Sequence, residues 1–360
     1  MLTKLFRGNI QHLLMLSECL GAFEWLKATF KVDRDIPLVG CLAFGLVDRG
    51  TNLIQVRPSS LCPLSCVFCS TDAGPKSRRR QTEYLVNLEY LVEAFRELAA
   101  FKGEGLEAHI DTVGDPLTYP WIVELVEALS QTPGVKVVSM QSKGYLLSER
   151  LAEELSEAGL SRLNLSVDAL DSELAVKLAD MPAYRVERVL GVAEHLAKNT
   201  ETDLLIAPVW VPRLNDKEIP KIVEFALKIG AGKRWPPLGI QRYEAHRRGR
   251  KPKGVKTQSW KSFYAELRRL ERLFRIKLVI AKEDFAIQRR PILPIPYRVG
   301  QRLRVKVVGP GWLRGEALAA TLDGLRSLTI VGLRQPPPLG VEIHVKLIGC
   351  KHNILLAEPV

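Results

Sequence analysis

The chain has 360 residues, of which 46% are hydrophobic and 26% charged, and its mean hydropathy is zero. No apolar run reaches the roughly 18 residues that a membrane span requires, and the first 32 residues lack the uninterrupted apolar segment of a signal peptide. The six cysteines, three of them clustered, do not have the pattern of a disulfide framework. These features exclude a membrane-spanning protein and a disulfide-stabilised secreted domain, and we expect a cytoplasmic protein that does not bind membranes.

The net charge of +12 is unevenly distributed along the chain. Residues 233–290 contain 18 Lys and Arg against 5 Asp and Glu, and residues 297–360 contain 9 against 4, whereas residues 1–232 contain 25 against 31. Such asymmetry indicates an anionic partner, with nucleic acid favoured over a membrane surface. The alternative is a generic charged surface of the kind that thermophilic proteins carry.

Residues 1–34 are expected to form a helical extension, because apolar residues recur at helical spacing up to about Phe30. The next two apolar stretches, 42–47 and 53–56, flank Asp48-Arg49-Gly50, which has the composition of a turn. They predict a β-hairpin whose second strand leads directly into a cysteine-rich loop.

Apolar strands and amphipathic helices alternate after this loop, up to about residue 245. Repeated strand–helix units predict an α/β fold with a parallel sheet and right-handed crossovers, here of about six units. The expected strands are 107–112, 135–140, 163–167, 203–211 and 238–243, and the expected helices are 85–101, 121–129, 148–158, 172–178, 185–198 and 217–229.

The character of the sequence changes twice after residue 245. Residues 246–296 form a basic connector with one expected helix, 260–273, and a segment, 289–296, whose prolines cannot lie inside a helix. Residues 297–360 contain short apolar stretches separated by Gly and Pro, which predicts a small β-barrel domain. Its expected strands are 302–308, 316–321, 327–331, 341–348 and 353–357.

Cys62, Cys66 and Cys69 give the strongest chemical signal, with the spacing C-x3-C-x2-C. Soft thiolates bind iron–sulfur clusters, zinc or Cu(I). A [4Fe–4S] cluster normally takes four cysteines, so three neighbouring cysteines without an obvious fourth leave one iron open to another ligand. The alternatives are unrelated core cysteines and a structural zinc site. Zinc would need a fourth ligand, and the sequence around His109, the next histidine, does not suggest one.

The cysteine motif resembles the signature of the radical SAM superfamily. The resemblance implies a partial (βα)6 barrel over residues 35–245 and a [4Fe–4S] cluster held by the three cysteines. It also implies that the open iron binds S-adenosylmethionine (SAM). Reduction by a donor such as ferredoxin or flavodoxin then cleaves SAM to methionine and a 5′-deoxyadenosyl radical. Phe68 stands where this family favours an aromatic residue near the adenine.

The segments that follow the expected strands resemble the SAM-binding motifs of that family. Val113-Gly114-Asp115-Pro116 is similar to its GGEP motif, with Val113 in place of the first glycine and Asp115 in place of the glutamate. Each of these residues taken singly has an ordinary alternative, a solvated turn residue. The resemblance implies SAM contacts from Gly114, Asp115, Ser142, Ser166, Asp168, Asn215 and Phe68, with Lys143 as a partner of the SAM carboxylate.

The C-terminal segment resembles a TRAM domain, a small OB-like RNA-binding barrel found at the end of several tRNA-modifying enzymes. The likeness covers residues 297–360, from VGQRLRVKVV to VEIHVKLIGCKHNILLAEPV. It implies an RNA-modifying enzyme, with tRNA as the first candidate. The cations between Lys76 and Arg80 are expected at the mouth of the active site. The candidates for RNA contacts are Arg247, Arg248, Arg250, Lys251, Arg302, Arg304, Lys306, Lys346 and Lys351.

Other interpretations stay open. In one, the enzyme acts on a protein, peptide or small metabolite instead of RNA. In another, the barrel does not bind RNA and only completes the fold. Cys19, Cys41 and Cys350 are scattered, which argues against the second cluster that methylthiotransferases carry. Because the cluster motifs all precede residue 297, the sequence predicts that deleting the barrel weakens RNA binding but spares SAM cleavage.

Overall fold

The computed structural model describes residues 28–360, so the helices expected before residue 28 lie outside the described residues. Thr29–Val32 form a strand, β1, and the expectation of helix up to Phe30 is wrong at this end. β1 pairs in parallel with β4 (Glu83–Val86), whose last residues were expected to begin a helix. Thr, Phe and Val favour strands, and pairing with β4 buries Val32 completely against the core.

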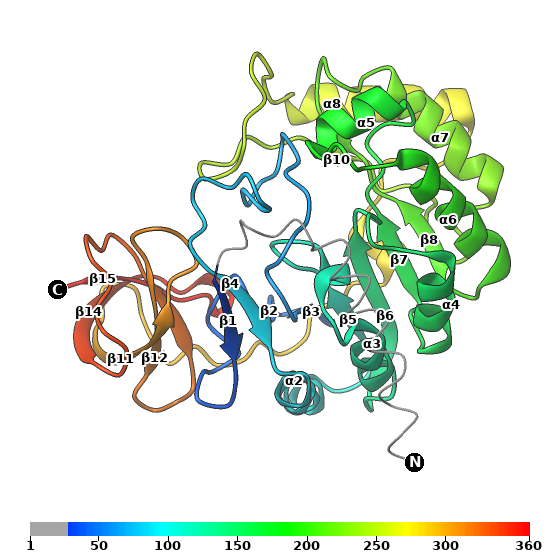
Figure 1. Ribbon diagram of the computed structural model, residues 1–360. Coiled ribbons are helices and arrows are strands. Elements are labelled where there is room, and N and C mark those ends of the chain that lie inside the picture. Colours follow the sequence, from blue (N-terminus) through cyan, green and yellow to red (C-terminus); the bar gives the residue numbers. More distant parts are fainter. Residues whose placement is uncertain (1–27) are drawn as a thin grey trace.

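A six-stranded sheet forms the centre of the molecule (Figure 1). Its order is β2-β3-β5-β6-β7-β8, and neighbours are parallel except β2 and β3, which form the expected hairpin. The carboxyl ends of the parallel strands therefore meet at one edge, where ligands of such folds bind. The strands are β2 Gly45–Asp48, β3 Leu53–Arg57, β5 Leu106–Ile110, β6 Val135–Ser142, β7 Arg162–Leu165 and β8 Asp203–Ile206.

The strand expected over residues 203–211 is interrupted at Pro208, which has no N–H to donate to a neighbour. β8 ends before it, and β9 (Val209–Trp210) pairs with β10 (Gln241–Arg242) outside the main sheet. One bridge between Ile206 and Leu238 connects β8 to the segment before β10. The sheet is thus a partial barrel, as the sequence predicted.

Helices cover the outer side of the sheet (Figure 1). Asn87, Ser148 and Asp171 begin three of them, each accepting a hydrogen bond from the backbone N–H three residues on. Within residues 28–360, no helix is both long and apolar enough to cross a membrane. The helices are α2 Leu88–Lys102, α3 Ile122–Ser130, α4 Glu149–Glu157, α5 Ser172–Ala179, α6 Val186–Asn199, α7 Glu218–Ile229 and α8 Trp260–Phe274, with 3-10 turns η1 Pro116–Thr118, η2 Lys282–Phe285 and η3 Lys351–Asn353.

The C-terminal strands form the closed five-stranded barrel that the sequence predicted, in the order β11-β12-β13-β15-β14. Alternate residues such as Val305, Val307 and Val345 are buried in a core of its own. Its kinship with TRAM domains stays a prediction. The strands are β11 Arg302–Pro310, β12 Ala317–Thr321, β13 Ser327–Ile330, β14 Glu342–Gly349 and β15 Leu356–Pro359.

The barrel is joined to the main domain along one side. Leu318 of β12 belongs to the core of the main domain. Ser327 N–H donates to the Val39 carbonyl at 2.9 Å, and Leu355 N–H donates to the Gly40 carbonyl at 2.9 Å. Gly40 has φ +132°, and a Cβ there would lie 1.8 Å from the Ser327 oxygen, so this close approach requires glycine.

A buried ion pair fixes the proline-rich segment against the β2–β3 hairpin. The side chains of Asp48 and Lys102 are fully buried, with Lys102 Nζ 2.7 Å from Asp48 Oδ1. Lys102 Nζ also donates to the Pro291 carbonyl at 2.9 Å, and Leu293 N–H donates to Asp48 Oδ2 at 2.8 Å. The connector is therefore attached to the sheet before it enters the barrel.

Lys102→Met is expected to lower the free energy of unfolding by about 3 kcal/mol, because it leaves the buried Asp48 carboxylate without its cation. Lys198→Ala, which removes the exposed ion pair with Glu194, is the control and should leave the free energy of unfolding nearly unchanged. Urea unfolding followed by circular dichroism measures both. Equal losses would show that the buried pair contributes no more than a surface pair.

Candidate active site

The cluster loop, residues 61–73, follows β3 and lies at the edge of the sheet where the parallel strands end. Its three cysteine side chains line a cavity of about 330 Å³. The other walls come from the segments that follow β5, β6 and β7 and from β10. The structure thus brings together most of the residues that the sequence analysis singled out. The predicted residues on the cavity wall are Cys62, Cys66, Cys69, Phe68, Gly114, Asp115, Ser142 and Ser166.

The three thiols fit a [4Fe–4S] cluster with one open iron. They are free and lie on one short loop, and among residues 28–360 no fourth cysteine lines the cavity. In the part of the chain that the structure describes, no group of three or more His, Cys, Asp or Glu side chains is placed to hold a single metal ion. In a cluster, by contrast, each thiolate binds a different iron, so the sulfur atoms need not converge on one point.

Burial affects the protonation of two of these thiols, Cys62 and Cys66. It raises the pKa of Cys62 well above its ordinary value, and the nearby Asp115 carboxylate raises it further. Burial also raises the pKa of Cys66, which Lys143 and Arg250 lower in part. Both thiols are therefore protonated at neutral pH in the metal-free protein, and binding of iron must displace their protons.

The turn after β5 is packed directly on the cluster loop. Asp115 N–H donates to the Leu61 carbonyl at 2.8 Å, and a Cβ at Gly114 would lie 1.9 Å from the same oxygen. The Asp115 carboxylate accepts from the Ser142 hydroxyl at 2.9 Å and from Lys143 N–H at 3.0 Å. Burial raises the pKa of Asp115, and these donors lower it. Gly114 thus permits the close approach, and Asp115 ties this turn to the end of β6.

Lys143 places a cation at the cavity wall. It forms an ion pair with Asp168, and its Nζ lies 5.7 Å from the centroid of the Phe68 ring. Asp168 lies behind Lys143, outside the wall, where its Oδ1 accepts from Val209 N–H at 2.8 Å. Burial lowers the pKa of Lys143, and the neighbouring Asp115 carboxylate raises it in part. An ammonium group in this position suits the binding of a carboxylate.

Asn215 does not reach the cavity, in contrast to the sequence-based expectation. Its side chain is buried, and Nδ2 donates to the carbonyls of Asp168 at 2.8 Å and Val209 at 2.9 Å. Its Oδ1 accepts from Val211 N–H at 2.8 Å. The amide therefore holds the backbone that carries Asp168. A polar residue after a strand can satisfy the backbone as well as a ligand, and the sequence does not distinguish these roles.

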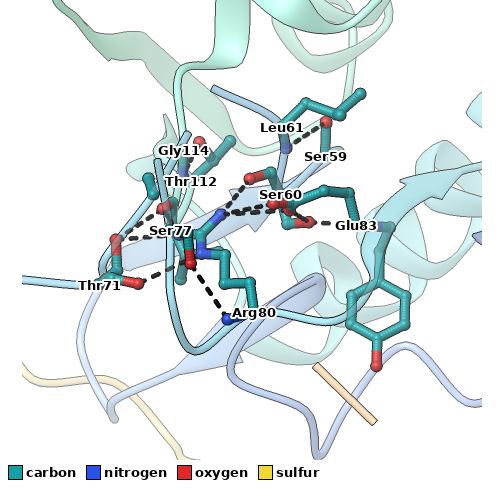
Figure 2. Close-up of polar contacts among 12 residues, drawn as sticks. Ser59, Ser60, Leu61, Thr71, Ser77, Arg80, Glu83, Thr112 and Gly114 are labelled. Carbon is teal, nitrogen blue, oxygen red and sulfur yellow. Dashed lines mark hydrogen bonds and ion pairs between the residues drawn. The ribbon is translucent and has the colours of Figure 1, made fainter. Parts of the chain in front are cut away.

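Two predicted surface arginines are structural. Arg250 is not available as an RNA contact, because its guanidinium donates to the Cys66 carbonyl at 2.7 Å and pairs with Asp72 at 3.0 Å. Arg80, expected at the mouth of the site, is 1% exposed and donates to Ser60 and Thr71 (Figure 2). Sequence reasoning missed both roles, since nothing local separates these arginines from their exposed neighbours.

The remaining RNA candidates lie at the surface. Three of them form ion pairs that leave the cation partly exposed: Arg248 with Glu316, Arg304 with Glu342 and Lys346 with Glu358. The exposed candidates outside these pairs are Arg247, Lys251, Arg302, Lys306 and Lys351. Their part in RNA binding stays a prediction.

Comparisons with known proteins identify the family of the main domain. The family model of the radical SAM superfamily matches residues 56–226. "Uncharacterized protein MJ0103" of Methanocaldococcus jannaschii is 37% identical over 354 residues, which cover 93% of this chain and 81% of that protein. GTP 3′,8-cyclase of Chlorobaculum tepidum is 31% identical over 176 residues, so the match covers 49% of this chain and only 50% of the cyclase.

Among solved structures, Streptococcus suis SuiB bound to S-adenosylmethionine aligns with a TM-score of 0.47 and 20% identity, over 66% of this chain and 48% of that one. The matched residues 56–226 contain the three cysteines and the turns at the ends of β5, β6 and β7. Residues 56–226 of the chain therefore belong to the radical SAM superfamily, whose cofactors are a [4Fe–4S] cluster and S-adenosylmethionine.

Proposed function

We propose that this radical SAM enzyme modifies RNA in the cytoplasm, with tRNA as the first candidate and ferredoxin or flavodoxin as the electron donor. The observation that carries the proposal is a basic rim beside the cavity. Arg314 N–H donates to the Arg79 carbonyl at 2.9 Å, and Arg248 pairs with Glu316 at 2.6 Å, so three cationic segments meet there. The exposed cations of the basic rim are Arg78, Arg79, Arg247, Lys251 and Arg314.

A second row of cations lies on the barrel. β11 and β14 are antiparallel, with Arg302 opposite Lys346 and Arg304 opposite His344. Because successive side chains of a strand point to opposite faces, these residues point outward while Val305 points into the barrel core. Cations arranged along a ribbon can neutralise successive phosphates of a nucleic acid backbone.

When bound, the cluster and SAM supply a 5′-deoxyadenosyl radical, and the chain binds, orients and shields the reacting groups. The three cysteines of the cluster loop would hold the cluster, and Lys143 would hold the SAM carboxylate. Gln241, Glu244 and His246 add polar groups to the wall where the chain enters the basic connector. A nucleotide of a folded RNA would have to leave its stack to reach this wall.

A small polar metabolite is the second candidate substrate. The relatives that share about half of this chain include GTP 3′,8-cyclases, which the name describes as acting on GTP. One face of the sheet also carries a polar network. Arg57 Nε donates to Asp111 at 3.1 Å, Gln55 donates to the same carboxylate at 2.7 Å, and Ser139 donates to Glu107 at 2.6 Å. Among the described residues, none of these side chains lines the cavity, so the second candidate rests on the names of these relatives.

Cys66→Ala is expected to abolish SAM cleavage, because it removes one of three protein ligands of the cluster. Cys350→Ala, at the start of η3 in the barrel, is the matched control and should leave cleavage unchanged. Anaerobic reconstitution should give about four irons per wild-type chain. About eight irons would reveal a second cluster, and SAM cleavage without product in the Cys350 variant would assign that thiol a carrier role.

Reversing three charges of the basic rim, in Arg79→Glu/Arg247→Glu/Arg314→Glu, is expected to weaken binding of folded RNA at least about tenfold. Each lost phosphate contact should reduce the slope of log affinity against log salt by about 0.7 to 0.9. Fluorescence anisotropy with an unmodified tRNA transcript measures both quantities. The control, Lys136→Glu/Lys177→Glu/Lys228→Glu, makes the same change in net charge at exposed positions on β6, α5 and α7.

Equal loss in the two triple variants would reduce the effect to net charge alone. The reaction itself is tested by mass spectrometry of tRNA and rRNA nucleosides from a deletion strain and its parent. A missing modified nucleoside would identify the product. An unchanged nucleoside profile, together with salt-insensitive RNA binding, would overturn the RNA proposal in favour of the metabolite.

A further inference from the structure

Arg80 connects segments on both sides of the three cysteines. Its guanidinium is buried and donates to the Ser60 carbonyl at 2.8 Å, two residues before the first cysteine. It also donates to the Thr71 hydroxyl at 3.0 Å, two residues after the last cysteine, and to the Val113 carbonyl (Figure 2). Glu83, at 3.2 Å, supplies the opposite charge. One side chain thus holds both ends of the cluster loop and the turn that carries Asp115.

Thr71 connects Arg80 to Cys69, one of the expected cluster ligands. Its hydroxyl donates to the Val113 carbonyl at 2.7 Å and lies 3.4 Å from Cys69 Sγ. The Ala73 N–H approaches the same sulfur at 3.2 Å. The position of Cys69 therefore depends on Thr71, and the position of Thr71 depends on Arg80.

The outer side of Arg80 is closed by the barrel. The centre of its guanidinium lies 4.8 Å from the centroid of the Trp312 ring. Main-chain hydrogen bonds flank this contact, with Gln81 N–H donating to the Trp312 carbonyl at 3.0 Å and Arg314 N–H donating to the Arg79 carbonyl at 2.9 Å. Trp312 Nε1 has no hydrogen-bond partner among the described residues. The indole therefore acts on Arg80 through its ring face.

The same part of the barrel also holds the connector against the cluster loop. Glu316, 3% exposed, pairs with Arg248 at 2.6 Å. Two residues on, Arg250 N–H donates to the Cys69 carbonyl at 2.8 Å and its Nε donates to the Cys66 carbonyl at 2.7 Å. A Cβ on the intervening Gly249 would lie 2.7 Å from the Cys69 oxygen. The connector is thus clamped between the barrel and two cluster ligands.

We propose that the C-terminal barrel completes the cofactor site, with Arg80 and Arg250 as positioning residues that the barrel loop 311–316 holds against the cluster loop. The barrel reaches the cysteines by two routes, through Trp312 and Arg80, and through Glu316 and the connector. Removing it would expose a buried arginine and release both routes. The inference from sequence that the barrel can be deleted without loss of SAM cleavage is therefore reversed.

The test compares Trp312→Ala with Trp312→Phe in the full-length protein. Phenylalanine keeps an aromatic ring face for Arg80 and loses the unused N–H with part of the indole ring system, so iron content and the KM for SAM should stay within about twofold of wild type. Alanine should lower iron retention after anaerobic reconstitution and raise the KM for SAM in substrate-free cleavage about tenfold or more. Electron paramagnetic resonance of the reduced protein, with and without SAM, should show a heterogeneous signal only for alanine.

Arg80→Lys and Glu316→Gln test the two routes separately and keep a side chain of similar size between the barrel loop 311–316 and the cluster loop. A lysine cannot reach the acceptors before and after the loop at once, so Arg80→Lys should behave like Trp312→Ala. Glu316→Gln should raise the KM for SAM through the connector, and Arg334→Ala, at another exposed position of the barrel, should have no effect. Circular dichroism establishes that each variant is folded, and an unfolded Trp312→Ala leaves the decision to these two variants.

Wild-type iron content and SAM KM in Arg80→Lys and Glu316→Gln would overturn the proposal. None of these readouts involves RNA, so they are independent of the proposed substrate.

Discussion

The positions of the segments around the cofactor site depend on one buried guanidinium. Arg80 is 1% exposed, and a charge so far from water is tolerated only where it is paired and hydrogen-bonded. Its partners lie just before the first cysteine, just after the last cysteine, in the turn after β5 and in the barrel. Because all four segments must be in place to satisfy one side chain, their positions are fixed together.

The topology of the sheet brings these segments together, and hydrogen bonds from charged side chains hold them in position. β3, β5 and β6 end at one edge, and each is followed by a loop that carries part of the site. Loops have no ladder of hydrogen bonds of their own. Here Arg80 and Arg250 donate to main-chain carbonyls, and Asp115 accepts from the main-chain N–H of Lys143 in a neighbouring loop. These contacts supply the rigidity that helices and strands have internally.

The sequence was informative where the signal is local. The cysteine spacing, the alternation of strands and helices and the five strands of the barrel all depend on neighbours within a few residues, and the structure has them. The pairing of β1 with β4 joins residues more than 50 positions apart, and no local sequence pattern predicts it. Arg80 and Arg250 look like members of basic runs, because their partners lie up to 232 residues away in sequence or on another loop. Asn215 failed as a predicted ligand for the same reason, since its acceptors are backbone carbonyls that only the fold brings near.

The barrel carries exposed cations on its surface and also contacts the cluster loop. Along β11, outward residues such as Arg302 and Arg304 alternate with Val305 and Val307, so one strand carries cations on its surface and packs a core beneath them. The loop that follows β11 contains Trp312 and Glu316, which hold the cluster loop and the connector. A polyanion bound along the outer ribbon would therefore sit on the same element that positions the cofactor site. Since Arg79 and Arg314 of the basic rim flank Arg80 and Trp312 in sequence, binding and cofactor positioning share one stretch of main chain. A substitution on the cation-bearing surface must therefore keep that main chain in place, because the cysteine site depends on it.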